Sequence, residues 1–402
     1  MKRMHYAWWV CIGCAVILFC TSGLSVNAFT VYQPYIMRFN GYTNAQSSLL
    51  ITVRSLCGFA SMLASGLYYK KVSLRLGMAL SCAVNGLGFL VYSLAKSYLT
   101  YCCAAALIGL GYGTGTMIPV VILLGRWFEK KRTLAIGACA AVTGFSSMGV
   151  PTIITAVIER WGMRVCFLGE GVFVVAMALA AFCLLRSDPA DMGLQPYGVG
   201  EGEKAAARKA GPGVEKKDWP LLIPALLMMG GVTGTGYSHL TVHASALGYT
   251  PHTVALCLTV SGTALMIGKV GYGWVAERIG SRNTNWVFGA LLVAGCAMLC
   301  LMRGGSPVLL FSAMAINGVG LGFTTVGNAA WAGAWSGPGQ YDNTVRRFQI
   351  GYSGGQLVFS SLPGIMADHA GGSYRGAYIV FLACSVFVLA AVQYLYYKKR
   401  VK

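Results

Sequence analysis

The sequence contains few charged residues and very few acidic ones. Of its 402 residues only 11% are charged, and 12 Asp and Glu stand against 31 Lys and Arg. A soluble domain carries about 25% charged residues, so this deficit excludes a water-exposed surface over most of the chain. The mean hydropathy of +0.62 agrees with this, and indicates a membrane protein.

Motifs for nucleotide binding or catalysis are also missing. The pattern G-x-x-x-x-G-K-[ST] is absent, and the glycine run at Gly109–Thr116 lies inside an apolar segment, which argues against a dinucleotide site. The 14 cysteines all fall in apolar spans, which favours packing over disulfides. His239 and His243 lie one helical turn apart, but no third ligand accompanies them. We expect no enzyme activity, no cofactor and no metal.

What the chain does contain is a series of apolar segments, each near the roughly 20 residues that a transmembrane helix needs. They cover residues 6–33, 44–69, 76–95, 98–125, 133–157, 165–185, 219–246, 252–276, 285–302, 306–335, 348–366 and 376–397. Backbone groups in lipid must be satisfied within the segment, so we predict an all-α membrane protein with twelve transmembrane helices. The first span lacks a cleavage-site pattern before it ends, and we expect it to be retained.

Basic residues concentrate in the loops that lie on the same side as the two termini. This bias predicts that both termini are cytoplasmic, in a multi-pass protein of a bacterial-type inner (plasma) membrane. The bases are scattered over short loops, which argues against nucleic-acid binding. We expect a monomer whose surroundings are the lipid bilayer.

The longest polar stretch separates two halves of the chain, residues 1–188 and 219–402. Residues 189–218 contain Pro, Gly, Ala, Lys and Glu without periodicity, which predicts a flexible cytoplasmic linker. We therefore expect an N-terminal six-helix half and a C-terminal six-helix half joined by this linker.

The two halves repeat each other. Gly109–Thr116 (GLGYGTGT) matches Gly318–Thr325 (GVGLGFTT), and Arg132–Gly137 matches Arg346–Gly351. Several matches in the same order indicate an internal duplication, so the halves should be pseudo-symmetric. Parallel six-span repeats are a transporter architecture, with the site between the halves near the midplane.

A loop signature follows the eighth span, Gly273–Arg282 (GWVAERIGSR), and a degraded copy, Gly66–Arg75, has Lys70 where an acid is expected. On this signature and the repeat, the whole chain resembles the major facilitator superfamily. In that family the acid and the bases of the signature clamp neighbouring inner helix ends. The resemblance implies a gating role for five residues: Glu277, Arg278, Gly273, Gly66 and Arg75.

Three further passages carry a narrower resemblance. They are Tyr6–Val10 (YAWWV) with Gln33–Pro34, the run Gly109–Gly113 leading to Arg126–Gly137, and His239 followed by Gly268–Gly273. In these passages the chain is similar to the oxalate/formate antiporter and monocarboxylate transporter group. In that group the position of Lys269 is commonly Arg and binds the substrate carboxylate, and the position of His239 lines the cavity.

Lys269 and Arg54 are the two bases that lie deep inside spans. A charge at that depth costs roughly 2.5–3.5 kcal/mol and usually faces a cavity or a partner. We expect Lys269 to bind the substrate anion, and Arg54 either to bind it as well or to gate its path. The alternatives are a snorkelling or structurally paired Lys269, and an Arg54 paired with Glu170 or with a helix C-terminus. Because Lys titrates more readily than Arg when desolvated, we hypothesise that proton and anion binding are coupled at Lys269.

Weaker polar candidates lie on other spans. For substrate binding they are Tyr112, His239, Tyr32, Asn27 and Asn328. Glu170 is the carboxylate well inside a span, where it either couples transport or serves structure. The scarcity of buried acids argues against transport of cations.

These observations predict a secondary active transporter of small organic anions, monocarboxylate or oxalate-like, that works by alternating access with proton coupling or exchange. The alternative is a proton antiporter for hydrophobic or cationic compounds; a membrane sensor is disfavoured because the linker is too short for a signalling domain. The glycine runs of spans four and ten, with Pro119, Pro151 and Pro363, are predicted bending points.

Overall fold

The computed structural model describes residues 5–42, 44–199 and 211–399. Within these ranges the chain is helical, and an isolated bridge between Phe128 and Tyr197 is the one strand-like pairing. The helices form two units. Unit 1 comprises residues 1–130 and 142–199, and unit 2 comprises residues 131–141 and 200–402.

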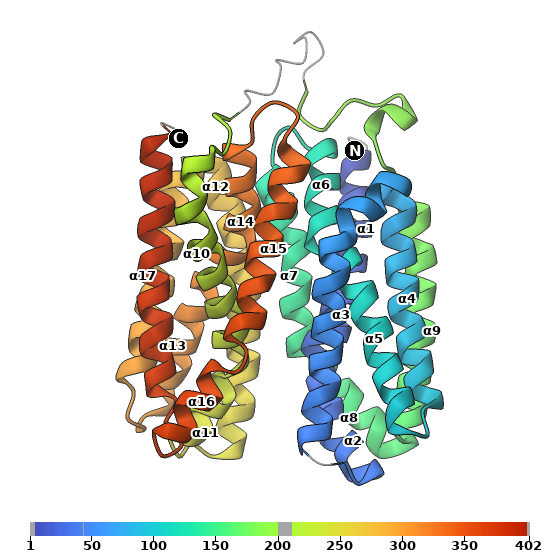
Figure 1. The fold of residues 1–402 in the computed structure, drawn as a ribbon, viewed down its shortest axis with the longest axis vertical. Helices are drawn as coiled ribbons and strands as arrows, with labels where there is room; N and C mark the ends of the chain where they lie inside the picture. The colour runs from blue at the N-terminus through green and yellow to red at the C-terminus, as the bar shows by residue number, and fades with distance from the viewer. Residues whose placement is uncertain (1–4, 43, 200–210, 400–402) are drawn as a thin grey trace. The chain divides into compact units, whose positions relative to one another are not determined.

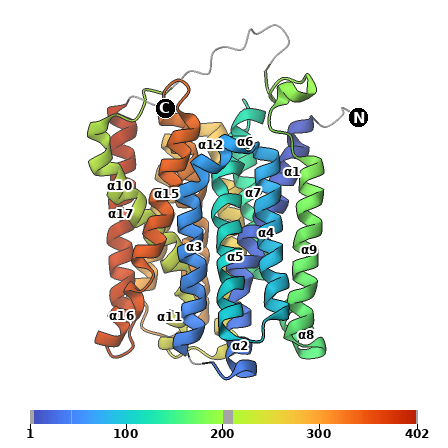
Figure 2. The ribbon, with the colours of Figure 1, turned by 45° about the vertical axis from the view of Figure 1, so that its right-hand side comes forward.

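Unit 1 contains most of the first half of the chain (Figure 1). Ser73 and Ser97 cap the N-termini of α4 and α5, and α4 lies beside both α5 and α9 in Figures 1 and 2. The elements are α1 (Tyr6–Leu18), η1 (Phe19–Asn27), η2 (Ala28–Val31), α2 (Tyr32–Asn40), α3 (Asn44–Lys71), α4 (Leu74–Leu94), α5 (Tyr98–Gly115), α6 (Met117–Trp127), α8 (Val150–Trp161), α9 (Met163–Leu184) and η3 (Pro189–Met192). Helix α7 (Arg132–Met148) begins in unit 2 and ends in unit 1.

Unit 2 contains the second half and the beginning of α7. Helix α10 packs against α15 and α17, as Figure 2 shows. The elements are η4 (Lys216–Asp218), α10 (Trp219–Gly230), η5 (Gly231–Gly236), α11 (Leu240–Ala246), α12 (Pro251–Leu301), α13 (Pro307–Gly320), α14 (Gly322–Trp335), α15 (Tyr341–Phe359), α16 (Leu362–His369) and α17 (Arg375–Lys398).

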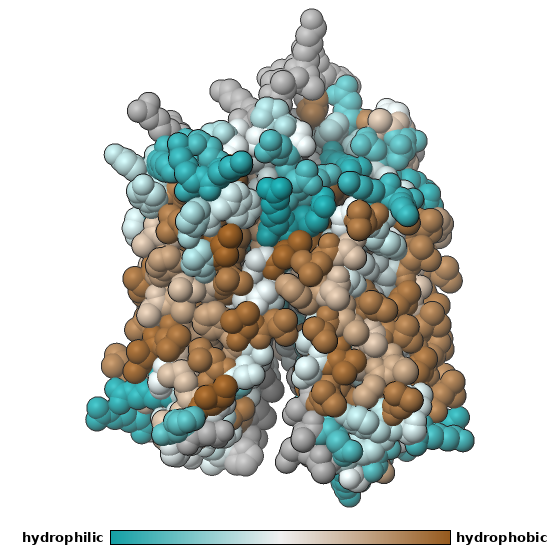
Figure 3. Space-filling model, in the orientation of Figure 1, coloured by the Kyte–Doolittle hydropathy of each residue, from teal (hydrophilic) through white to brown (hydrophobic). Residues whose placement is uncertain are grey.

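The predicted twelve spans are confirmed. Ten stretches of the described residues are long and apolar enough to cross a membrane. One of them, Thr259–Leu301, holds two spans, because α12 breaks at Gly280, whose φ of +79° favours glycine. Helices α15 and α16 form the one remaining span, the eleventh in chain order, which is more polar than the others. Figure 3 shows apolar side chains over the middle of each unit and hydrophilic ones at its ends.

The same irregularities occur in both halves of the chain. The first span of each half contains a π-helical stretch. It covers Phe19–Asn27 in the first half and Gly231–Gly236 in the second. Breaks separate α5 from α6, α7 from α8, α13 from α14 and α15 from α16. These breaks lie at the predicted glycine runs or beside Pro119, Pro151 and Pro363, which confirms the bending points. π-Helical turns inside α-helices are frequent at functional sites, so the first span of each half is a candidate part of the site.

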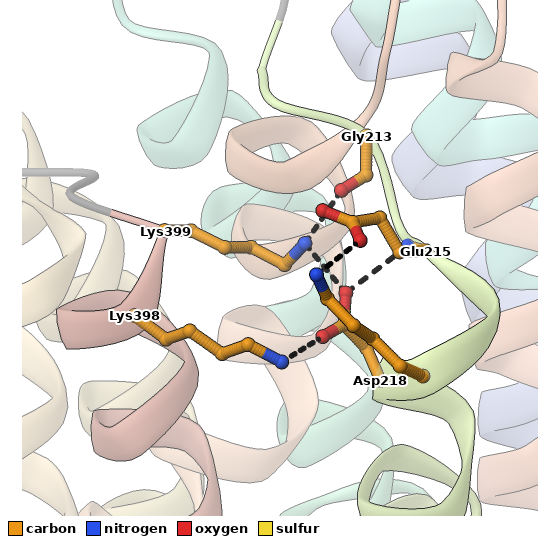
Figure 4. A network of polar contacts seen from close by, with 6 residues as sticks. Gly213, Glu215, Asp218, Lys398 and Lys399 are labelled. Atoms are coloured by element: carbon orange, nitrogen blue, oxygen red, sulfur yellow. Dashed lines mark hydrogen bonds and ion pairs between the residues drawn. The ribbon is translucent and has the colours of Figure 1, made fainter.

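The described ends of the polar segment between the halves are bound to helices. The backbone of Tyr197 bonds Trp127, Glu129 and Lys130 in unit 1. In unit 2, Asp218 forms ion pairs with Lys398 at 2.9 Å and Lys399 at 2.6 Å, as Figure 4 shows. The predicted flexible linker, residues 189–218, is therefore anchored over its described parts; residues 200–210 lie outside the described residues.

Candidate functional site

Lys269 is buried in the first part of α12, with 6% of its surface exposed. Its ammonium Nζ donates a hydrogen bond to the backbone carbonyl oxygen of Ala140 on α7, at 3.2 Å. Both residues belong to unit 2. A buried ammonium needs oxygen acceptors, so this carbonyl provides part of what water would supply at the surface.

The contact between α7 and α12 extends along one face of each helix. Lys269, Gly273 and Glu277 are four residues apart and share a face of α12. A Cβ at Gly137 would collide with the carbonyl oxygen of Lys269, and one at Gly273 would lie 2.7 Å from that of Thr133. Small residues allow two membrane helices to approach this closely. We call this contact, Lys131–Ala140 against Lys269–Glu277, the α7–α12 seam.

Glu277 closes the seam at the start of α7. Its carboxylate accepts hydrogen bonds from the backbone N–H groups of Lys131, at 3.2 Å, and Thr133, at 3.0 Å. A carboxylate is stabilised at a helix N-terminus, where N–H groups have no intrahelical acceptor. Lys131 is held there at φ +62°, the one described non-glycine residue with positive φ.

Arg54 is the buried cation of unit 1, with 8% of its surface exposed on α3. Its guanidinium donates to the carbonyl oxygen of Ser25 at 2.7 Å and lies over the ring of Phe29, 5.4 Å from the centroid. Ser25 belongs to the π-helical part of the first span. A Cβ at Gly58, one turn along α3 from Arg54, would lie 3.1 Å from Cδ1 of the Tyr112 ring. The structure therefore brings Tyr112 toward Arg54.

Tyr32 and Glu170 form a pair of their own in unit 1. The fully buried Tyr32 donates from its hydroxyl to Oε2 of Glu170 at 2.6 Å, and its ring stacks on Phe167 with centroids 4.2 Å apart. The other oxygen of Glu170, Oε1, is buried and has no hydrogen-bond partner among the described residues. The Tyr32 hydroxyl is thus occupied by Glu170 in this structure.

The remaining polar candidates are spread over both units. Asn27 donates to the carbonyl of Thr143 at 2.8 Å, and Asn328 donates to Gln349 at 3.2 Å. The Nδ1 atom of His239 lies 2.9 Å from the carbonyl oxygen of Thr235. Oδ1 of Asn328 is buried and has no partner in the part of the chain that the structure describes.

Two gating candidates bind nearby groups on their own unit. Arg75 donates to the carbonyl of Phe182 at 2.8 Å near the C-terminal end of α9, where a base is stabilised. The Arg278 guanidinium lies over the ring of Trp274, 3.7 Å from its centroid. Gly66 is part of α3.

No group of three or more His, Cys, Asp or Glu side chains that suits a metal is found among the described residues. His243, one turn from His239, is buried and its Nε2 lies 3.0 Å from the carbonyl oxygen of Leu299. The two histidines therefore have different backbone partners.

The backbone carbonyls that accept hydrogen bonds from the two cations are not predictable from the sequence. The carbonyls of Ser25 and Ala140 carry no signal in their side chains. A π-helix exposes carbonyls irregularly, and composition does not reveal it. Gly137 was visible as part of a repeated motif, but its place against Lys269 depends on tertiary packing.

Comparison with known proteins gives three kinds of match. The family described as Major Facilitator Superfamily matches residues 15–303 and 240–402. Monocarboxylate transporter 12 of Rattus norvegicus is 21% identical over 76% of this chain and 68% of its own. The Aspyridones efflux protein apdF of Emericella nidulans is 20% identical over 69% of this chain and 55% of its own.

A solved structure has the same fold. The crystal structure of a Major Facilitator Superfamily transporter, FucP, in the outward conformation superposes with a TM-score of 0.72, covering 96% of this chain and 98% of that one at 15% identity. The chain spans about two thirds of the length of Monocarboxylate transporter 12 of Rattus norvegicus.

Proposed function

Because the chain belongs to the Major Facilitator Superfamily, whose members are membrane transporters, we propose that it carries small organic anions, monocarboxylates or oxalate-like dicarboxylates, by alternating access. One observation carries the proposal: the buried Lys269 ammonium is hydrogen-bonded to a carbonyl oxygen. A substrate carboxylate offers the same kind of acceptor with a full negative charge. The similarity to proteins named monocarboxylate transporters supports this substrate class.

Arg54 supplies a second buried cation, on unit 1. The guanidinium has five N–H donors in a planar fork, which suits carboxylate recognition. We propose that Arg54, with Tyr112, contacts the anion or gates its path. Asn27, Tyr32, His239 and Asn328 are proposed as further polar contacts.

The proposed coupling is either proton symport or anion exchange. Glu170 is the proposed coupling acid, because it is a carboxyl group inside a span with Tyr32 as its phenol partner. Glu277, Arg278, Gly273, Gly66 and Arg75 are the proposed gating residues. Glu277 and Gly273 already contribute to the α7–α12 seam.

We propose halves of residues 1–188 and 219–402 joined by residues 189–218, a monomer, and cytoplasmic termini in a bacterial-type inner membrane. The bias of Lys and Arg toward the loops on the side of the termini supports this orientation.

The alternative is a proton antiporter for hydrophobic or cationic compounds, which the similarity to a protein named as an efflux protein keeps open. Two buried cations disfavour it, because they repel a cationic substrate.

A thermal-shift screen of the purified protein separates the two. We expect formate, oxalate, lactate or pyruvate to raise the melting temperature, because a ligand that binds only the folded state stabilises it. Organic cations of similar size should give no shift. Stabilisation by cations alone would reject the anion assignment in favour of the alternative.

A further inference from the structure

The hydrogen bond from Lys269 to Ala140 connects the proposed anion-binding residue to another helix. Ala140 is 3% exposed and lies on α7, whereas Lys269 lies on α12. A backbone carbonyl oxygen has two lone pairs, so it accepts this bond in addition to a helical one. Moving α7 away from α12 would therefore remove an acceptor from the Lys269 ammonium.

Gly137 sets the distance between the two helices at this point. It lies one turn before Ala140 on α7, and any Cβ there would collide with the backbone oxygen of Lys269. The only way to accommodate a methyl group is to separate the helices, since a backbone carbonyl has no rotamer to change. Gly273 has the same role one turn further along α12, against Thr133.

Glu277 fixes the register of the seam. Because its carboxylate binds the N–H groups of Lys131 and Thr133, α7 does not slide along α12 without losing both bonds. Glu277 thus fixes the position of α7 along α12, and Gly137 fixes the distance between the two helices. Together they set the position of the Ala140 carbonyl relative to Lys269.

We propose that the Ala140 carbonyl competes with the substrate carboxylate for the Lys269 ammonium, and that Gly137 positions the carbonyl for this competition. The inference rests on the proposed function and adds a regulation of that same site. An anion that takes the ammonium also releases α7 from α12 at the Ala140–Lys269 end of the seam. Substrate binding and loosening of the seam are then coupled, so that the bound anion shifts the population toward the loosened state.

The test is Gly137→Ala in purified protein, with formate, oxalate, lactate and pyruvate as probes. We expect the Kd of the bound carboxylates to fall by about threefold to tenfold, the range for the net value of one hydrogen bond. In proteoliposomes KM should fall with it, while kcat falls because the seam no longer closes fully. A purely structural defect would not lower KM.

Gly169→Ala on α9 is the matched control, because no atom lies within 4 Å of a Cβ at Gly169. It should leave Kd, KM and kcat unchanged. If Gly137→Ala does not yield folded protein, Gly273→Ala loosens the same seam from α12, and a smaller decrease in Kd is expected.

An unchanged or increased Kd in a folded seam variant would overturn this inference and leave the proposed function standing. If none of the four carboxylates binds the wild-type protein, the proposed function and the inference fail together. A lower Kd with lower KM and kcat supports the competition.

Discussion

At the scale of single residues, each of the two buried cations donates a hydrogen bond to a backbone carbonyl oxygen on another helical element. Lys269 and Arg54 were predicted from their depth inside apolar spans, and both are buried. Their acceptors, the carbonyls of Ala140 and Ser25, could not be predicted, because every residue has a carbonyl and only the tertiary structure selects one. The substrate-binding roles of both cations stay predictions.

The pair of Tyr32 and Glu170 gives a prediction about stability. Tyr32→Phe removes the hydroxyl that donates to Oε2 of Glu170 at 2.6 Å. Neither oxygen of this carboxyl group then has a hydrogen-bond partner among the described residues. We expect a loss of about 1–3 kcal/mol, the penalty for an unsatisfied buried group, measured by thermal unfolding in detergent. Tyr35→Phe is the control, because its bond to Glu159 is long and exposed. Equal losses in the two variants would contradict a special role for the Tyr32 pair.

At the scale of elements, the sequence predicted the spans and most of their breaks. Proline and glycine bend helices by mechanisms that their side chains reveal, so the breaks near Pro119, Pro151 and Pro363 were predictable. The π-helices at Phe19–Asn27 and Gly231–Gly236 were not, because they arise from a backbone bonding pattern. The polar segment 189–218 was predicted to be flexible, yet its described ends are bound to helices.

The anchor at the start of α10 can be tested through Asp218, whose partners are labelled in Figure 4. Asp218→Asn removes the charge that faces Lys398 and the buried Lys399, which has 4% of its side chain exposed. Breaking a buried ion pair typically costs about 3–5 kcal/mol, so we expect a clear decrease in melting temperature.

Glu215→Gln is the matched control for this variant. Its pair with Lys217 is more than half exposed on both sides, and such pairs contribute less than about 1 kcal/mol. A melting temperature lowered as much by Glu215→Gln as by Asp218→Asn would contradict the account of the anchor.

At the scale of the whole molecule, the duplication in the sequence predicted the repeated architecture. Both halves widen their first span and break their fourth and fifth spans. The sequence could not reveal that residues 131–141 of the first half belong to unit 2. That grouping follows from the α7–α12 seam, where Gly137 and Gly273 allow the helices to approach closely and Glu277 binds the start of α7. The hydrophobic periodicity of the sequence does not indicate such long-range contacts.

The central claim is that Lys269 binds the transported anion. The most direct measurement is counterflow of a labelled carboxylate, chosen from the four probes, in proteoliposomes with wild-type protein and with Lys269→Gln. The account predicts accumulation by the wild type and background levels for the variant, since Gln removes the charge at the site. Wild-type rates in folded Lys269→Gln would contradict it.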